Sequence, residues 1–109
     1  MIFMSTDHIV ILVTCADNAQ ARAIAGAVLE THLVACVNIV PQIRSLYWWE
    51  GAIQDEQELL CIIKTRADKF EAVRRAVAAV HPYEVPEIIA LPMEHGHRPY
   101  LDWIDNCVK

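Results

Sequence analysis

Three short segments of this chain are apolar at successive positions, and they constrain its fold more than any other feature. They read IVILV, LLCII and EIIAL, at residues 9–13, 59–63 and 87–91. Such short runs, rich in β-branched residues, are typical of strands. Because neighbouring side chains of a strand point to opposite faces, a sheet built from these runs carries apolar groups on both faces.

Helical periodicity occupies the segments between the strands. Asp17, with Gln20 three residues later, predicts a helix start. The helix runs to about residue 32, with an apolar face made by Ala21, Ile24, Ala25, Val28 and Leu29. Asp68 predicts the cap of a second helix, which Pro82 ends. Its expected buried stripe is Phe70, Val73, Val77 and Val80.

The remaining segments complete the predicted order. Strands are expected at residues 8–15, 35–49, 58–65 and 86–92, with a bend or bulge at Pro41. Glu50-Gly51 predicts a hairpin turn, and Pro99 suits the first turn of a final helix. The order is βαββαβ plus a C-terminal helix, the split βαβ plan of an α+β fold. We therefore expect one domain, residues 1–109, with a four-stranded antiparallel sheet and two helices on one of its faces.

The second face of that sheet needs a cover. Burying apolar surface contributes about 25 cal/mol per Å², and monomers seldom leave a large apolar patch exposed. A tail helix of about three turns is too short for a whole sheet face. The sequence therefore predicts a homo-oligomer, with the hairpin around Trp48 and Trp49 as the reaching element. One tryptophan is expected to pack inward and the other toward a partner or pocket.

Composition excludes several functions. Nine basic and fourteen acidic residues give a net charge of −5, and the basic residues are scattered, which argues against nucleic-acid binding. No apolar run reaches membrane-spanning length, and the N-terminal segment MIFMSTDHIVILVTC lacks a basic leader. The four cysteines form no C-x-x-C pair. We expect a cytoplasmic protein with reduced thiols and no membrane partner.

Chemically capable side chains gather in the segment VHPYEVPEIIALPMEHG, residues 80–96. His81 and Glu87 could ligate a divalent ion, since imidazole and carboxylate suit Cu, Zn or Ni. The alternative is that His81 only caps a helix C-terminus. Cys15 could add a thiolate, or could be inert packing. Lys64 is expected to face solvent or meet Glu87.

Two carboxylates precede the third predicted strand. We expect Glu56 and Glu58 to face solvent.

Three stretches together resemble the CutA family of divalent-cation tolerance proteins. They are ACVNIVPQIRSLYWWEG, ELLCIIKT and HPYEVPEIIALP, the last followed by HG and YLDWI. The resemblance covers nearly the whole chain in order. It implies a ferredoxin-like fold, a homotrimer joined through sheet edges and long hairpins, a cytoplasmic location and a role in the response to divalent metal ions, copper among them. It implies no enzymatic reaction.

The resemblance also implies a pocket between subunits for a metal ion or small molecule. Its lining would include Trp49, Lys64, His81, Tyr83 and Glu87. Metal binding in the family is linked to a first-strand cysteine and a histidine pair. Here Val13 holds the matching strand position, with Cys15 two residues further on, and Val80 precedes His81. We therefore expect weak binding of Cu²⁺ or another divalent cation, with His81, Glu87 and Cys15 as ligands.

Three other functions stay open at this point. The first is a trimeric sensor of nucleotides or metabolites, although three glycines cannot form a phosphate-binding loop. The second is an enzyme that uses Lys64, His81 and Glu87 as acid-base groups. The third is a trimer with a purely structural role.

Overall fold

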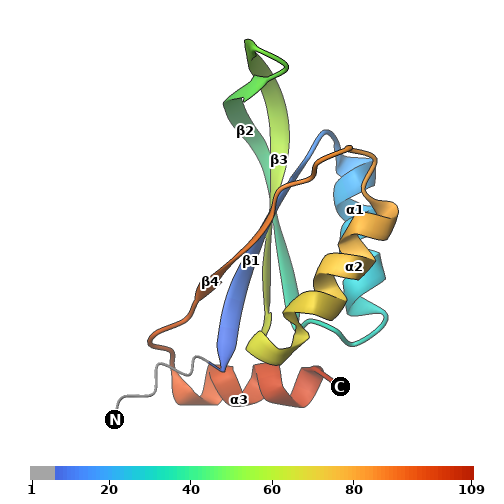
Figure 1. Ribbon diagram of the computed structural model, residues 1–109. Coiled ribbons are helices and arrows are strands. Elements are labelled where there is room, and N and C mark those ends of the chain that lie inside the picture. The colour runs from blue at the N-terminus through green and yellow to red at the C-terminus, as the bar shows by residue number, and fades with distance from the viewer. Residues whose placement is uncertain (1–6) are drawn as a thin grey trace.

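A four-stranded antiparallel sheet in the order β2-β3-β1-β4 organises the computed structural model, which describes residues 7–109. The elements are β1 (His8–Cys15), α1 (Asn18–Leu29), β2 (Cys36–Trp49), β3 (Ala52–Arg66), α2 (Phe70–Val80), β4 (Ile88–Pro92) and α3 (Arg98–Cys107). This order confirms the predicted α+β plan, βαββαβ followed by a C-terminal helix (Figure 1). The N-terminal segment was predicted to lack a basic leader, and its residues 1–6 lie outside the described residues.

The β2–β3 hairpin is the longest feature of the molecule. Its turn has positive φ at Glu50 (50°) and Gly51 (81°), as a two-residue type I′ turn requires. The pairing register shifts between Val40 and Ile43, so the bulge predicted at Pro41 is confirmed. β3 begins at Ala52 rather than at residue 58. The hairpin therefore extends beyond the rest of the sheet (Figure 1), within overall dimensions of 45 × 34 × 23 Å.

One face of the sheet forms the main core under α1 and α2. The buried residues are Ile9, Ile11, Val13, Cys15, Leu59, Cys61 and Ile63 from the strands, with Ala21, Ile24, Val28, Val73 and Val77 from the helices. The predicted start of α1 is confirmed. The Gln20 amide donates to Asp17 Oδ1 (2.8 Å), and Gln20 Oε1 accepts from the Ala16 amide (2.9 Å).

The start of α2 differs from the prediction. A 3₁₀ turn, Ala67–Lys69, precedes the helix, and its N-cap is Lys69 with no side-chain cap bond. Asp68 instead pairs with Arg66 at 2.9 Å, so the predicted Asp68 cap is wrong. Val80 is also exposed rather than buried. None of the helices in residues 7–109 has both the length and the apolar character that crossing a membrane requires.

The opposite face of the sheet is largely open. Val10, Leu12 and Ile62 are half-buried there, and Ile89 and Leu91 are 49% and 51% exposed. The helix α3 covers one end of the sheet (Figure 1), where His8 Nε2 lies 2.9 Å from Asp105 Oδ1. The apolar character predicted for both faces is therefore present in the fold.

The two hairpin tryptophans do not follow the prediction. Trp48 is 71% exposed and Trp49 is 38% exposed. The expectation that one of them packs inward is wrong for the single chain, because the tip of the β2–β3 hairpin lies beyond the layer that the helices cover (Figure 1).

Candidate functional site

His81 sits where α2 ends and the chain turns toward β4. Its extended backbone (φ −82°, ψ 129°) is the conformation expected before Pro82. The ring is almost fully buried, with Nε2 2.8 Å from the Thr14 carbonyl oxygen, while Nδ1 accepts from the Tyr83 amide at 3.2 Å. A carbonyl can only accept, so the proton lies on Nε2. Both nitrogens of a neutral imidazole are thereby engaged.

Tyr83 connects this histidine to a buried carboxylate. Its ring centroid lies 4.5 Å from that of His81, and its hydroxyl donates to Glu58 Oε2 at 2.7 Å. Burial raises the pKa of Tyr83 well above its ordinary value, and the hydrogen bond to Glu58 raises it further. The hydroxyl therefore stays a donor across the physiological range.

Glu58 was expected to face solvent, and that expectation is wrong, because its exposure is only 6%. The reason is tertiary. β1 ends at Cys15, which pairs with Leu59, so Glu58 lies one residue beyond the paired length of β3 on that side. Tyr83, arriving from the loop after α2, meets the carboxylate there.

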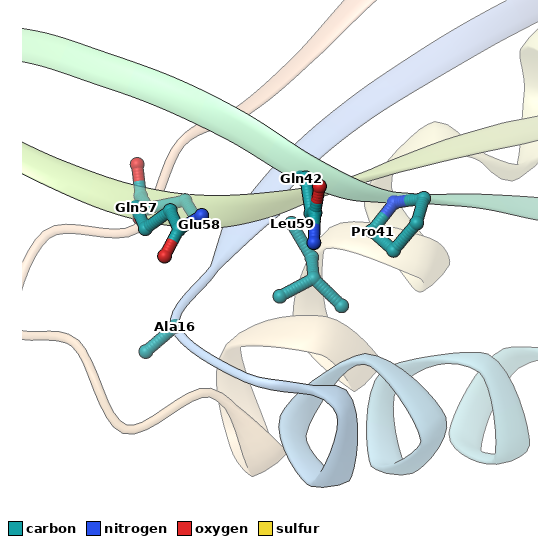
Figure 2. A pocket seen from close by; sticks show the side chains of 6 residues that line it. All are labelled: Ala16, Pro41, Gln42, Gln57, Glu58 and Leu59. Carbon is teal, nitrogen blue, oxygen red and sulfur yellow. The ribbon is translucent and has the colours of Figure 1, made fainter.

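A small cavity of about 160 Å³ adjoins Glu58. Figure 2 shows it between the β2–β3 pair and the loop that carries Ala16 toward α1. Its other lining residues are Pro41, Gln42, Gln57 and Leu59. The bulge places Pro41 and Gln42 at this point, a common use of bulges near binding sites.

The Glu58 carboxylate gives this cavity the chemistry of a hydrogen-bond acceptor. Within residues 7–109, Glu58 forms no ion pair, and its Oε1 makes no hydrogen bond. A buried carboxylate gains much from a cation or from additional donors. The cavity is therefore suited to a cationic group or a hydrogen-bond donor.

Cys15 and Glu87 are not placed with His81 as a coordination group. Cys15 is fully buried, and burial, with a smaller effect of Cys61, raises the pKa of its thiol to about 12. Thiolate is the form that binds metal. Glu87 is exposed and forms no hydrogen bond or ion pair within the described chain. The described residues contain no group of three or more His, Cys, Asp or Glu that could hold a metal ion.

The ligand prediction for Cys15, His81 and Glu87 therefore stays a prediction that this single-chain geometry does not favour.

The predicted cleft residues Trp49 and Lys64 lie away from this cluster. Trp49 pairs with Ala52 beside the hairpin turn. Lys64 donates to Asn38 Oδ1 at 2.5 Å, and does not meet Glu87. Ala52, the partner of Trp49, lies six residues before Glu58 in β3, and Lys64 lies six residues after it. At the usual rise of a strand, each is about 20 Å from Glu58, in opposite directions along β3. One chain thus brings His81 and Tyr83 together with Glu58, but not with Trp49 or Lys64.

Comparison with known proteins identifies relatives of this chain. The family model described as "CutA1 divalent ion tolerance protein" matches residues 9–107. The "Divalent-cation tolerance protein CutA" of Thermus thermophilus is 48% identical over 95 residues, which cover 87% of this chain and 92% of that protein. The chain spans only part of two other relatives. It is 47% identical to 64% of the "Protein CutA homolog" of Xenopus laevis, and 50% identical to 55% of the mouse "Protein CutA".

Solved structures show the same fold. The "Periplasmic divalent cation tolerance protein CutA" from Archaeoglobus fulgidus superposes with a TM-score of 0.90 at 45% identity, over 94% of this chain and 99% of that one. The "Divalent cation tolerance protein (Cut A1)" from Thermus thermophilus gives the same TM-score, identity and coverage.

Proposed function

Since the chain belongs to the CutA1 divalent ion tolerance family, we propose that it acts in tolerance to divalent metal ions, copper among them, as a homotrimer. A cation or small ligand binds in clefts between the subunits, and no reaction is catalysed.

The open face of the sheet supports the assembly. Ile89 and Leu91 are about half exposed on β4, and Leu46 and Ile53 are more than 60% exposed on the hairpin. β2 and β4 are the two edges of the sheet, and an unpaired edge invites pairing with another chain. Further copies of the chain would cover both the apolar face and the edges.

Glu58 is the residue that supports binding of a cation or small ligand. It is a buried carboxylate that opens into a cavity and has no cationic partner among residues 7–109. The hairpin of a neighbour could bring Trp49 to this position, and the neighbour's β3 could bring Lys64. His81 then acts through Tyr83, by holding the tyrosine that orients Glu58.

The proposed cytoplasmic location is supported by the cysteines. All four, Cys15, Cys36, Cys61 and Cys107, are free thiols in the fold, as expected for a reducing compartment. Fractionation of cells that produce the chain, with thiol labelling of each fraction, would test the location.

Calorimetric titration with Cu²⁺ tests the ligand part. Wild type should release heat on binding, and Glu58→Gln should weaken binding by at least about tenfold, one carboxylate contact being worth 1.4 kcal/mol or more. His81→Ala should weaken binding less, because it acts through Tyr83. Glu94→Gln, at an exposed carboxylate, is the control. Identical isotherms for wild type, Glu58→Gln and His81→Ala would show that Cu²⁺ does not bind at this site.

A further inference from the structure

The cavity beside Glu58 restricts its ligand by size and by the nature of its wall. Its volume of about 160 Å³ is well below the roughly 300 Å³ at which pockets for drug-sized molecules begin, so a nucleotide does not fit within it. It is larger than the roughly 30 Å³ that one water molecule occupies in the liquid. Pro41 and Leu59 make part of the wall apolar. The cavity therefore suits a small polar head group that carries a short alkyl chain.

The polar part of the wall consists of acceptors that the chain leaves unoccupied. Glu58 is 6% exposed, and its Oε2 accepts from Tyr83, whereas its Oε1 makes no hydrogen bond within residues 7–109. Figure 2 shows the carboxylate directed toward the loop that carries Ala16. Gln42 also lines the cavity, is exposed, and makes no hydrogen bond through its amide to the described part of the chain. A buried carboxylate in this state gains most from a donor that carries positive charge.

The described chain directs its nearby positive charge elsewhere. Arg44 lies on β2, one position from the strand partner of Glu58. Its guanidinium binds Asp55 instead, with Nε 2.7 Å from Oδ1 and Nη2 3.2 Å from Oδ2. A second carboxylate, Glu56, adds negative potential: burial is the largest cause of the raised pKa of Tyr83, and the charges of Glu58 and Glu56 raise it further. The cavity thus has an excess of negative charge.

These groups offer more to an organic cation than to a metal ion within one chain. The described residues contain no cluster of three or more His, Cys, Asp or Glu, so a metal ion at Glu58 obtains one charged ligand from this chain. A primary ammonium group needs acceptor oxygens for its three N–H groups. Glu58 and Gln42 provide such oxygens, and water can accept from the third N–H.

We propose that the Glu58 cavity binds a primary alkylammonium group. The group donates to Glu58 Oε1 and to the amide oxygen of Gln42, its alkyl chain contacts Pro41 and Leu59, and no covalent bond forms. The inference rests on the proposed function, because it names the class of ligand that the proposed cleft takes. A free alkylamine is one source of this group, and the Lys64 side chain of a neighbouring copy is the other.

Butylammonium is the probe, because an alkylamine is fully protonated at pH 7, as lysine is. It is titrated into the isotope-labelled full-length chain in phosphate buffer free of amines and metals, and the backbone amide resonances report the binding position and the dissociation constant. Butanol has the alkyl chain without the charge, and tetramethylammonium has the charge without N–H groups. Butylammonium should give saturable shifts at Ala16, Gln57 and Leu59, and neither control compound should do so at the same concentrations.

Three variants test the contacts. Glu58→Gln keeps the shape of the side chain and should weaken binding at least about tenfold, because it removes a charged acceptor. Gln42→Met removes an amide at an exposed position and should weaken binding about two- to tenfold. Glu56→Gln makes the same charge change on the same strand, outside the lining residues. It is the control and should weaken binding at most about fivefold.

Lys64→Met separates the two sources. If the ligand is a free amine, wild type and Lys64→Met should both bind butylammonium. If Lys64 of a neighbouring copy occupies the cavity, wild type should not respond, whereas Lys64→Met should bind butylammonium and should lose that binding when Glu58→Gln is added.

The proposal is overturned if neither wild type nor Lys64→Met binds butylammonium, if Glu58→Gln does not weaken the binding, or if butanol or tetramethylammonium shifts the same amides equally. Such a failure is distinguishable from failure of the proposed function, because the Cu²⁺ titration and the sedimentation of wild type test the metal response and the assembly without any amine.

Discussion

At the scale of single residues, the molecule is defined by a few buried polar groups. Glu58 is buried with one hydroxyl donor from its own chain, Tyr83, and no cation among the described residues. A buried charge in that position is stabilised by its hydrogen bond far more than an exposed one would be. The Tyr83–Glu58 contact therefore contributes both to folding and to the shape of the cavity.

Tyr83→Phe should lower the free energy of unfolding by about 1.5–3 kcal/mol, the usual worth of a hydrogen bond to a charged group. The reason is that Glu58 Oε2 loses its donor while the side chain stays buried. Urea denaturation at neutral pH measures the change. Tyr47→Phe, which removes a hydroxyl from Glu56 on the exposed hairpin, is the matched control and should change stability little. Equal effects of the two variants would contradict this account.

The thiol of Cys15 makes stability depend on alkaline pH. Burial raises its pKa from 9.0 to about 12 in the folded chain. Below pH 9 the thiol is protonated in both states, and its contribution to stability is fully present. Between pH 9 and 12 the unfolded chain loses this proton while the folded chain keeps it, so stability falls as pH rises.

Cys15→Ala should therefore show a shallower loss of stability from pH 9 to 12 than wild type, whatever its stability at pH 7. Denaturation curves at several pH values give the two slopes. Cys36→Ser controls for changes at another thiol, and parallel slopes for wild type and Cys15→Ala would show that Cys15 is not responsible.

At the scale of elements, the β2–β3 hairpin shows how local chemistry sets geometry. Its turn places Glu50 at φ 50°, a region that disfavours most side chains, whereas Gly51 at 81° is unstrained. Asn-Gly is the preferred pair for such a turn. The native pair thus carries strain at one of its two positions.

Glu50→Asn should raise the free energy of unfolding by about 1 kcal/mol, because asparagine tolerates the left-handed conformation that costs glutamate roughly this amount. Thermal or chemical denaturation detects the gain. Glu50→Ala, which removes the carboxylate without relieving the backbone, should give no such gain. A similar gain from both variants would point to charge rather than to φ.

At the scale of the whole molecule, the unequal cover of the sheet is the dominant feature. Two helices bury one face, while α3 covers one end of the other (Figure 1). The remaining apolar strand residues and the extended hairpin are left for other copies in the proposed trimer. Assembly should therefore depend on side chains of the open face.

Leu91→Glu should shift the protein from trimer to monomer in sedimentation experiments at low micromolar concentration, because the charge would be buried between copies without a partner. Val85→Glu is the control. Val85 is 68% exposed but lies in the loop before β4, outside the sheet. A wild-type chain that sediments as a stable monomer would contradict the proposed assembly, and a Leu91→Glu trimer would place the interface elsewhere.

Many features of this fold follow from patterns that span only a few residues. The order of strands and helices follows from hydrophobic periodicity, and the Asp17–Gln20 start of α1 follows from capping chemistry. The turn at Gly51, the bulge at Pro41 and the extended His81 follow from the restricted φ of glycine and proline and of the residue before proline. Local sterics act before any tertiary contact forms, so they can be predicted from the chain alone.

The candidate sites depend instead on contacts between distant residues. Glu58 meets Tyr83 across 25 positions, and His81 meets the Thr14 carbonyl across 67. His81 and Tyr83 could be named from their motif, but the engagement of both His81 nitrogens and the burial of Glu58 could not. Whether a carboxylate is solvated or buried, and whether an imidazole keeps a free lone pair, depends on which segments the packed sheet and helices bring alongside it. No pattern within a single segment contains that information.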